Sequence, residues 1–205
     1  MKKIKDKLIT IYPQLIFLIV TFCIFMPSSL FLGNLDEFAV GFAALIPLLM
    51  AASLITAVVV ILVGLIVPKK ICNIYAAVIF GGALAAYVQG NFLNPDFGVL
   101  NGRQIQWGQF KVNAIISTVV WIVLIVVPPV VVCFKKNIMT NIIKWGSLFL
   151  SSIQVVTLVV LIVSSKRSVD YSYVVTKNDE FALSSQGNVV VFIVDTLDND
   201  DAQNY

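Results

Sequence analysis

The chain has 205 residues, of which 59% are hydrophobic and only 12% are charged, and its mean hydropathy is +0.95. Soluble domains carry about a quarter of their residues as charged side chains, so this composition excludes an ordinary soluble domain and predicts an integral membrane protein. The net charge of +3 is too small to indicate a nucleic-acid partner, and the absence of histidine excludes a histidine-based triad, proton shuttle or zinc site within the sequence.

Five long apolar runs predict five transmembrane helices. A basic N-terminal stretch precedes the first run, which is too long for a signal-peptide core and lacks an Ala-x-Ala cleavage site, so we expect a retained helix. Each run must be helical, because only a helix satisfies its own backbone hydrogen bonds in lipid. The runs extend from Leu8 to about Leu32, from Ala39 to Val67, from Ile71 to about Val88, from Asn113 to Cys133 and from about Ile142 to Ser164.

Three features within these runs predict how the helices are used. The second run exceeds the roughly 20 residues that a span needs, and Pro47 is its expected kink point. The third run is expected to be the packing helix of the bundle, because small residues let helices approach closely in lipid. Gln154 is expected to form an interhelical hydrogen bond rather than to bind a substrate. The small residues of the third run are Gly81, Gly82, Ala83, Ala85 and Ala86.

The apolar cores contain no Asp or Glu, which favours an anchor over a conduit for ions or protons. Cys23, Cys72 and Cys133 are odd in number and form no CxxC pair, so they are interpreted as small membrane-buried hydrophobic residues.

The distribution of charge predicts the orientation in the membrane. Lysines at the N-terminus, at 69–70, at 135–136 and at 144 fall on one side of a five-span chain, whereas Asp36, Glu37 and Asp96 fall on the other. The positive-inside rule therefore places the N-terminus in the cytoplasm and the C-terminus outside the cell. The pair Lys166-Arg167 on the external side runs against this bias.

Two polar stretches connect or follow the helices. The external segment from Gln89 to Trp107 mixes Asn, Gly, Pro and aromatic residues, and predicts an ordered set of turns. It is interpreted either as a simple interfacial connector or as a contact to lipid or to the following domain. The segment 166–186 is polar and is interpreted as an external linker.

The stretch Gly187-Asn-Val-Val-Val-Phe-Ile-Val-Asp195-Thr196 predicts a buried β-strand that ends in a carboxylate. Ligand sites of open α/β sheets lie beyond the carboxyl ends of the strands, so Asp195 is expected to face a site. A carboxylate there suits a hard divalent cation, although a helix cap or a hydrogen-bonded carboxylate is the alternative interpretation. The following acidic residues, from Asp198 to Asp201, lack the spacing of a calcium loop and are interpreted as a solvated loop or a helix N-terminus.

The segment from Asn188 to Asp198 resembles the opening strand of the sulfatase-like branch of the alkaline phosphatase superfamily. With five spans and an external tail, the chain resembles the lipoteichoic acid synthase family and related phosphoglycerol or phosphoethanolamine transferases. The loop from Gln89 to Gly102 is similar to a loop of such proteins. The resemblance implies that Asp195 binds a metal, that Thr196 is not the nucleophile, and that the nucleophile and the other ligands come later in the sequence.

We therefore expect an all-α five-helix membrane bundle (1–165), an external linker (166–186) and the first β-strand of an α/β sulfatase-like domain (187–205). About twenty residues cannot build a core, so the chain is expected to be a truncated or N-terminal piece, without activity or bound metal of its own. No catalytic residue is assigned within it. The complete protein is expected to use a divalent metal (Mn, Mg, Zn or Ca).

The leading hypothesis is the membrane anchor of a metal-dependent sulfatase-like hydrolase or transferase, acting on lipid-linked phosphodiesters or cell-envelope polymers at the outer face of the cytoplasmic membrane. The alternatives are a non-enzymatic membrane interaction or regulatory protein, and a small transporter component. The expected partners are membrane lipid and a lipid-linked envelope substrate, with no nucleic acid. The sequence assigns no oligomeric state, no substrate-binding residue and no transferred group.

Overall fold

The computed structural model describes residues 2–35, 38, 40–95 and 107–165. Every secondary-structure element within these ranges is helical, and five helical spans are long and apolar enough to cross a membrane. The predicted multi-pass helical bundle is thereby confirmed. The linker 166–186 and the predicted strand that ends at Asp195 lie outside the described residues.

The first span is one continuous helix with a change of pitch in its middle. Helix α1 (Lys2–Leu18) passes into a π-helical segment, η1 (Ile19–Phe25), which passes into α2 (Met26–Gly33). Pro13 lies inside α1 and Pro27 in the first turn of α2. A π-helical segment places one extra residue in a turn and so re-aims the side chains that follow it.

The other four spans follow in order. The second is α3 (Ile46–Ile66), entered through the 3-10 turn η3 (Phe42–Leu45). The third is α4 (Cys72–Val88), which begins after the 3-10 turn η4 (Lys69–Ile71) and continues into a π-helical turn, η5 (Gln89–Leu93). The fourth is α5 (Lys111–Phe134), after the 3-10 turn η6 (Trp107–Phe110), and the fifth is α6 (Lys136–Ser164).

One sequence-based prediction about these boundaries is wrong, and another is refined. Pro47 lies in the first turn of α3, where its missing N–H costs no α-helical hydrogen bond, and the kink expected there stays a prediction. The 3-10 turn η3 takes up part of the excess length of that run. The connector after the third span begins later than predicted, because Gln89–Leu93 prolongs the helix as a π-helical turn.

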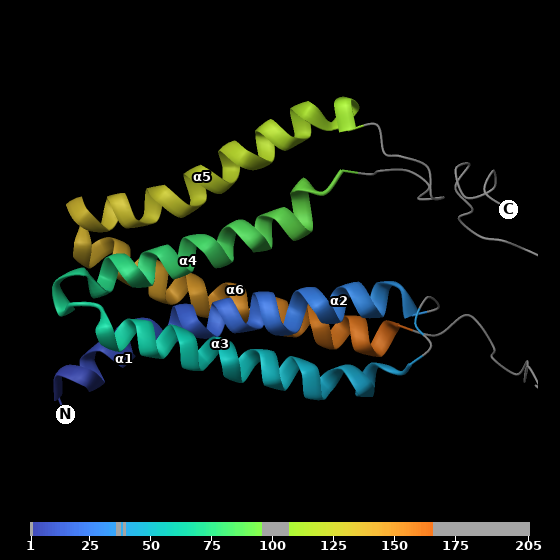
Figure 1. Cartoon of the computed structure of the whole chain (residues 1–205), viewed down its shortest axis with the longest axis horizontal. Helices are drawn as coiled ribbons and strands as arrows, with labels where there is room; N and C mark the ends of the chain where they lie inside the picture. Colours follow the sequence, from blue (N-terminus) through green and yellow to red (C-terminus); the bar gives the residue numbers. More distant parts are fainter. Residues whose placement is uncertain (1, 36–37, 39, 96–106, 166–205) are drawn as a thin grey trace, which may run out of the picture. The chain divides into compact units, whose positions relative to one another are not determined.

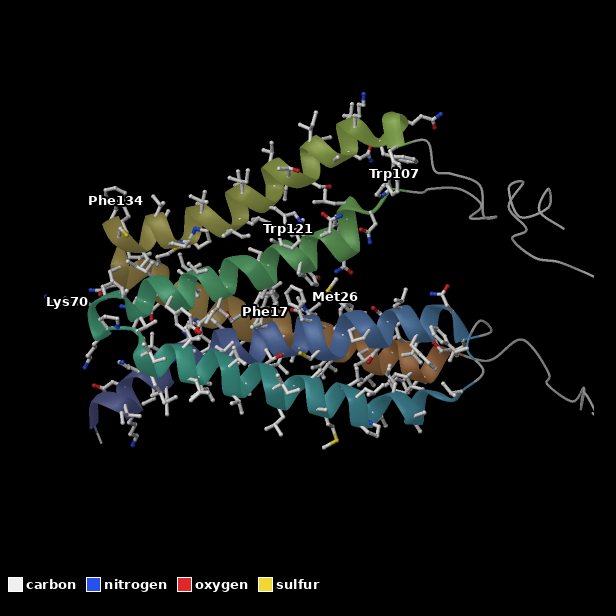
Figure 2. The ribbon with its side chains drawn as sticks, in the orientation of Figure 1. Phe17, Met26, Lys70, Trp107, Trp121 and Phe134 are labelled. Atoms are coloured by element: carbon white, nitrogen blue, oxygen red, sulfur yellow. The ribbon has the colours of Figure 1, made fainter. Side chains whose placement is uncertain are left out.

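Successive spans alternate in direction, so the connections gather at two ends (Figure 1). We call the end that holds the start of α1, the α3–α4 connection and the α5–α6 connection the basic end, and the end where α6 finishes the tail end. Lys70 and Phe134 mark the basic end in Figure 2, and Trp107 marks the tail end. The basic end carries Lys5, Lys7, Lys69, Lys70, Lys135, Lys136 and Lys144.

The core is built around α4, as its small residues predicted. A buried cluster joins Phe17 of α1 to Ala77, Phe80 and Ala83 of α4, and the Phe17 and Phe80 rings lie 5.8 Å apart. Gly81 lets α5 approach, since a Cβ atom there would meet the carbonyl oxygen of Leu124. Gly82 makes no such contact. The predicted packing role is confirmed for Gly81 and for the buried alanines.

Each of the three cysteines lies on one of the five apolar spans, as the sequence predicted. Cys23 and Cys72 are buried, whereas Cys133 is exposed on α5, and all three are free thiols.

Candidate functional site

The predicted metal ligand Asp195 lies outside the described residues. Within residues 2–35, 38, 40–95 and 107–165, no group of three or more His, Cys, Asp or Glu side chains could hold a metal ion. The metal assignment stays a prediction that concerns Asp195 alone.

A polar seam runs between α1 and α6 and forms the most distinctive chemical feature of the bundle. On α6 the polar residues recur every three or four positions, which places them on one helix face. Thr10, Gln14 and Thr21 recur at similar spacing on the α1–η1 helix, and α1 packs against α6. The polar residues on α6 are Thr140, Lys144, Ser147, Ser151 and Gln154.

The centre of the seam is the buried pair Thr21 and Gln154. The hydroxyl of Thr21 donates to Oε1 of Gln154 at 3.2 Å, and Nε2 of Gln154 lies 3.0 Å from Thr21 Oγ1, and both side chains are 0% exposed. The predicted interhelical hydrogen bond of Gln154 is thereby confirmed. In lipid such a pair stabilises helix association, because each polar group would otherwise lack a partner.

The π-helical segment η1 directs neighbouring polar side chains toward two different helices. Thr21 bonds to α6, and two residues later the Cys23 thiol lies 3.4 Å from the Thr56 hydroxyl of α3. Because the segment holds both contacts, it fixes α3 and α6 on different sides of the first span.

The buried polar groups of the seam are uncharged and are mostly satisfied by hydrogen bonds. The Ser147 and Ser151 hydroxyls donate to the carbonyl oxygens of Ile143 and Ser147, each at 2.7 Å. The Ser28 hydroxyl is the one buried side-chain polar atom of the described residues without a hydrogen-bond partner. Ion or proton translocation normally uses ionisable groups at such depth, and this seam provides none in its buried part.

A second feature is a pocket at the tail end, which we call the tail-end pocket. It lies between α2, η5 and α6 and has a volume of about 650 Å³. Asn34 and Asn91 donate their amide N–H groups to the carbonyl oxygens of Leu30 and Tyr87, at 2.8 and 2.7 Å. Their Oδ1 atoms therefore remain as acceptors, and Thr157 adds a hydroxyl. Phe25, Met26 and Leu161 supply apolar wall.

Among the described residues that line the tail-end pocket, none is charged. Its mixture of amide oxygens and apolar wall suits the neutral polar part of an amphiphile, with hydroxyl or amide donors near its head and hydrocarbon beyond. It is not suited by charge to hold a metal ion or a free anion.

Sequence reasoning identified Gln154 but missed its partner and the seam. The recoverable signal was the three-to-four-residue recurrence of polar side chains in the first and fifth runs, which helical periodicity would have placed on facing sides. The tail-end pocket has no comparable sequence signal. The residues of η5 read as a loop, so helical periodicity does not place Asn91 on the face that lines the pocket.

No protein-family model, no curated protein and no solved structure matches the chain.

Proposed function

We propose that this chain is the membrane anchor of a metal-dependent sulfatase-like hydrolase or transferase that acts on lipid-linked phosphodiesters or cell-envelope polymers. The observation that carries the proposal is the sequence pattern of an apolar run and a carboxylate from Asn188 to Asp198, which follows five membrane spans and the polar segment 166–186. In this proposal the N-terminus is cytoplasmic and the tail after Ser164 is extracellular.

The direction of the helices supports this orientation. Five alternating spans bring the end of α6 to the tail end, opposite the start of α1 (Figure 1). Lysines of the described residues are concentrated at the basic end, while Lys111 lies near the tail end. Because an excess of lysine marks the cytoplasmic side, this asymmetry favours a tail on the external side.

The chemistry of the bundle interior supports an anchor over a transporter component. The buried polar side chains of the described residues are Gln, Thr and Ser, and none is ionisable. The Thr21–Gln154 pair links helices to each other, so its hydrogen-bonding capacity serves the fold rather than a passing solute.

Asp195 is proposed as one oxygen ligand of the divalent cation, because a carboxylate at a strand end is a hard, fixed donor. One carboxylate is far from a complete ligand set, and the resemblance assigns the nucleophile and the remaining ligands to later parts of the complete enzyme. When bound, the metal would polarise a phosphoryl or sulfuryl oxygen.

The tail-end pocket gives a place in this proposal for the substrate lipid. It lies at the membrane face to which the catalytic domain would be attached, and its acceptor oxygens and apolar wall match an amphiphile. The anchor would then hold the domain at the right leaflet and also raise the local concentration of a lipid-linked substrate.

Membrane topology is the first test. In a Cys133→Ser background, the introduced thiol of Ser184→Cys is expected to react with a membrane-impermeant maleimide on intact cells. Lys70→Cys, at the basic end, is the matched control and is expected to react only after the cells are permeabilised. If Ser184→Cys also requires permeabilisation, the tail is cytoplasmic and an external enzyme is excluded.

Metal binding by the complete protein is the second test. Asp195→Asn is expected to weaken Mn²⁺ binding by at least about tenfold. Removal of a residue that only hydrogen-bonds to a metal ligand already lowers metal affinity by about that factor, and removal of a ligand should lower it at least as much. Asp198→Asn is the matched acidic control and is expected to leave the affinity unchanged. Equal affinities for Asp195→Asn and the parent protein would remove the metal role of Asp195.

A further inference from the structure

A second pocket lies at the basic end, between α1, α4 and α6, and we call it the basic-end pocket. Its volume is about 200 Å³. Six of its nine lining residues are polar, which is unusual for a gap between apolar helices. The six polar residues are Thr10, Gln14, Asn73, Thr140, Asn141 and Lys144.

The pocket contains an unpaired positive charge. Among the described residues, the one salt bridge joins Lys69 to Asp6 at 2.8 Å. Asp6 is the only acidic residue of α1, and its carboxylate is therefore already paired with Lys69. Lys144 therefore has no carboxylate partner in this part of the chain. Its ammonium lies 5.4 Å from the ring centre of Trp145, a contact that leaves its hydrogen-bond donors available.

Donors and acceptors in the pocket are divided between its members. Asn73 and Asn141 keep their amide N–H groups free of hydrogen bonds to the described residues. Gln14 is 2% exposed, and one end of its amide lies 2.8 and 3.1 Å from the carbonyl oxygens of Thr10 and Ile11. Because only an N–H group can donate to these two oxygens, that end is assigned as Nε2, which leaves Oε1 as an acceptor. A ligand with anionic oxygens and a hydroxyl would satisfy both sets.

The start of α4 adds to the positive potential. Helix α4 begins at the basic end, and Asn73 lies in its first turn. The N-terminus of a helix carries a partial positive charge that attracts anions. Neighbouring lysines of the basic end act in the same sense, because a cluster of lysines attracts anionic lipid headgroups.

The depth of the pocket matches the headgroup level of a bilayer. Trp145 follows Lys144 directly and is 65% exposed, as expected for an interfacial aromatic anchor. Ile9 provides an apolar wall that is 51% exposed on the side of α1, where an acyl chain could continue. A soluble anion would not use that wall.

We propose that the basic-end pocket binds the phosphate of an anionic phospholipid from the leaflet at the basic end, with Lys144, Asn73 and Asn141 as donors and Gln14 as acceptor for a headgroup hydroxyl. The bound lipid joins α1, α4 and α6 where they begin. This lipid is separate from any substrate at the tail end, and the inference does not depend on the proposed enzymatic role.

The test compares two lysines of the basic end in the full chain. Purified protein is titrated with phosphatidylglycerol, and bound lipid is counted by native mass spectrometry. Lys144→Gln is expected to lower the affinity about tenfold or more, because a charge-assisted hydrogen bond is lost. Lys70→Gln removes a lysine that does not line the pocket and is expected to lower it less than about fivefold. Equal losses in the two variants would overturn the proposal.

Two further measurements separate the possible sources of binding. Asn73→Leu removes a donor from a different helix and occupies part of the cavity, so it is expected to reduce lipid retention as Lys144→Gln does, and unchanged retention would contradict the assignment. Phosphatidylcholine is expected to leave fewer retained lipids than phosphatidylglycerol. Displacement of the lipid by millimolar inorganic phosphate would overturn the lipid assignment in favour of a free-anion site.

Discussion

The second and third spans rank in opposite order by hydropathy and by burial. In the most apolar window of Phe42–Ile66 the mean hydropathy is 2.8, and only 6% of the window is buried inside the protein. In the corresponding window of Lys69–Leu93 the mean hydropathy is 1.8, and 50% of the window is buried. The fourth span, Trp107–Phe134, resembles the second, because its mean hydropathy is 2.8 and 11% of its window is buried. Hydropathy therefore does not identify the central helix of this bundle.

The physical reason is that lipid and protein interior are equally apolar. A leucine on α3 or α5 gains nothing by turning inward, so large aliphatic side chains can face the acyl chains. Helices meet where side chains are small or where polar groups find partners, and α4 offers the first and the α1–α6 seam offers the second. We infer that the stability of the bundle is concentrated in the contacts of α4 with α1 and α5 and in the α1–α6 seam.

The largest expected contrast lies between Phe17 and Leu54. Phe17→Ala leaves a cavity at a fully buried site against Phe80 and is expected to lower the unfolding free energy by about 3 kcal/mol. This value is at the low end for aromatic-to-alanine substitutions, because a side chain that leaves the bundle enters lipid rather than water, so mainly packing contacts are lost. Leu54→Ala, on a side chain that is 67% exposed on α3, is expected to change it by less than about 0.5 kcal/mol. Denaturation of both variants in micelles with SDS measures the difference, and equal losses would break the division between central and peripheral helices.

The adjacent glycines of α4 give a closer test at one helix–helix contact. Gly81→Ala must displace the α5 backbone, since its Cβ would meet the carbonyl oxygen of Leu124 and lie 3.0 Å from Ile125 Cα, and a loss of about 1–3 kcal/mol is expected. Gly82→Ala has nothing within 4 Å of its Cβ and is expected to be neutral or slightly stabilising. The same SDS titration ranks the two variants. A larger loss for Gly82→Ala would mean that α4 and α5 pack through another face.

A double-mutant cycle on Thr21 and Gln154 tests the polar part of the seam. Gln154→Leu is expected to cost about 1–2 kcal/mol, because Thr21 is left buried without its partner. The coupling between Thr21→Val and Gln154→Leu is expected to be about 0.6 kcal/mol, the average for hydrogen bonds between membrane helices. Ser152→Ala, which removes an exposed hydroxyl bonded only to its own helix, is the control. A coupling of zero would show that the two side chains stabilise the bundle independently.

The sequence predicted the number and approximate limits of the spans because continuous hydrophobicity over about twenty residues is a strong signal. It also predicted the central role of α4, because residues such as Gly81 and Ala83 have a direct meaning in lipid. The π-helical segment η1 was not predictable, since its residues Ile19–Phe25 are apolar and compatible with an α-helix. Its pitch depends on contacts with α3 and α6 that are distant in sequence.

The candidate sites were less predictable than the fold. Lys144 was interpreted only as a topology signal, because its position beside Asn73 depends on how α4 and α6 pack. The start of α6 at Lys136 rather than near Ile142 also mattered, since it places Thr140 and Asn141 on the helix that lines the basic-end pocket. Asp195 shows the reverse case, because its proposed role comes from a local sequence pattern alone.

The smallest expected effect concerns how the peripheral helix α3 is held at its end. The Lys7 ammonium donates to the carbonyl oxygens of Leu65 and Val67, at 2.7 and 2.6 Å, where α3 finishes. Lys7→Met keeps the apolar stem and removes this contact between a cation and a helix C-terminus, so a loss of about 0.3–1 kcal/mol is expected. Lys69→Met, which breaks only the exposed pair with Asp6, is the control, with an expected change of less than about 0.5 kcal/mol.

Hydrogen exchange sharpens this last comparison, because it resolves individual helix ends. Lys7→Met is expected to speed amide exchange in the last turn of α3 while leaving Ala76 and Ala77 of α4 unchanged, since those two residues are buried in the core of the bundle. If exchange in α4 rises equally, the end of α3 is coupled to the core. The division between a stable centre and loosely held lipid-facing helices would then have to be replaced by a single cooperative bundle.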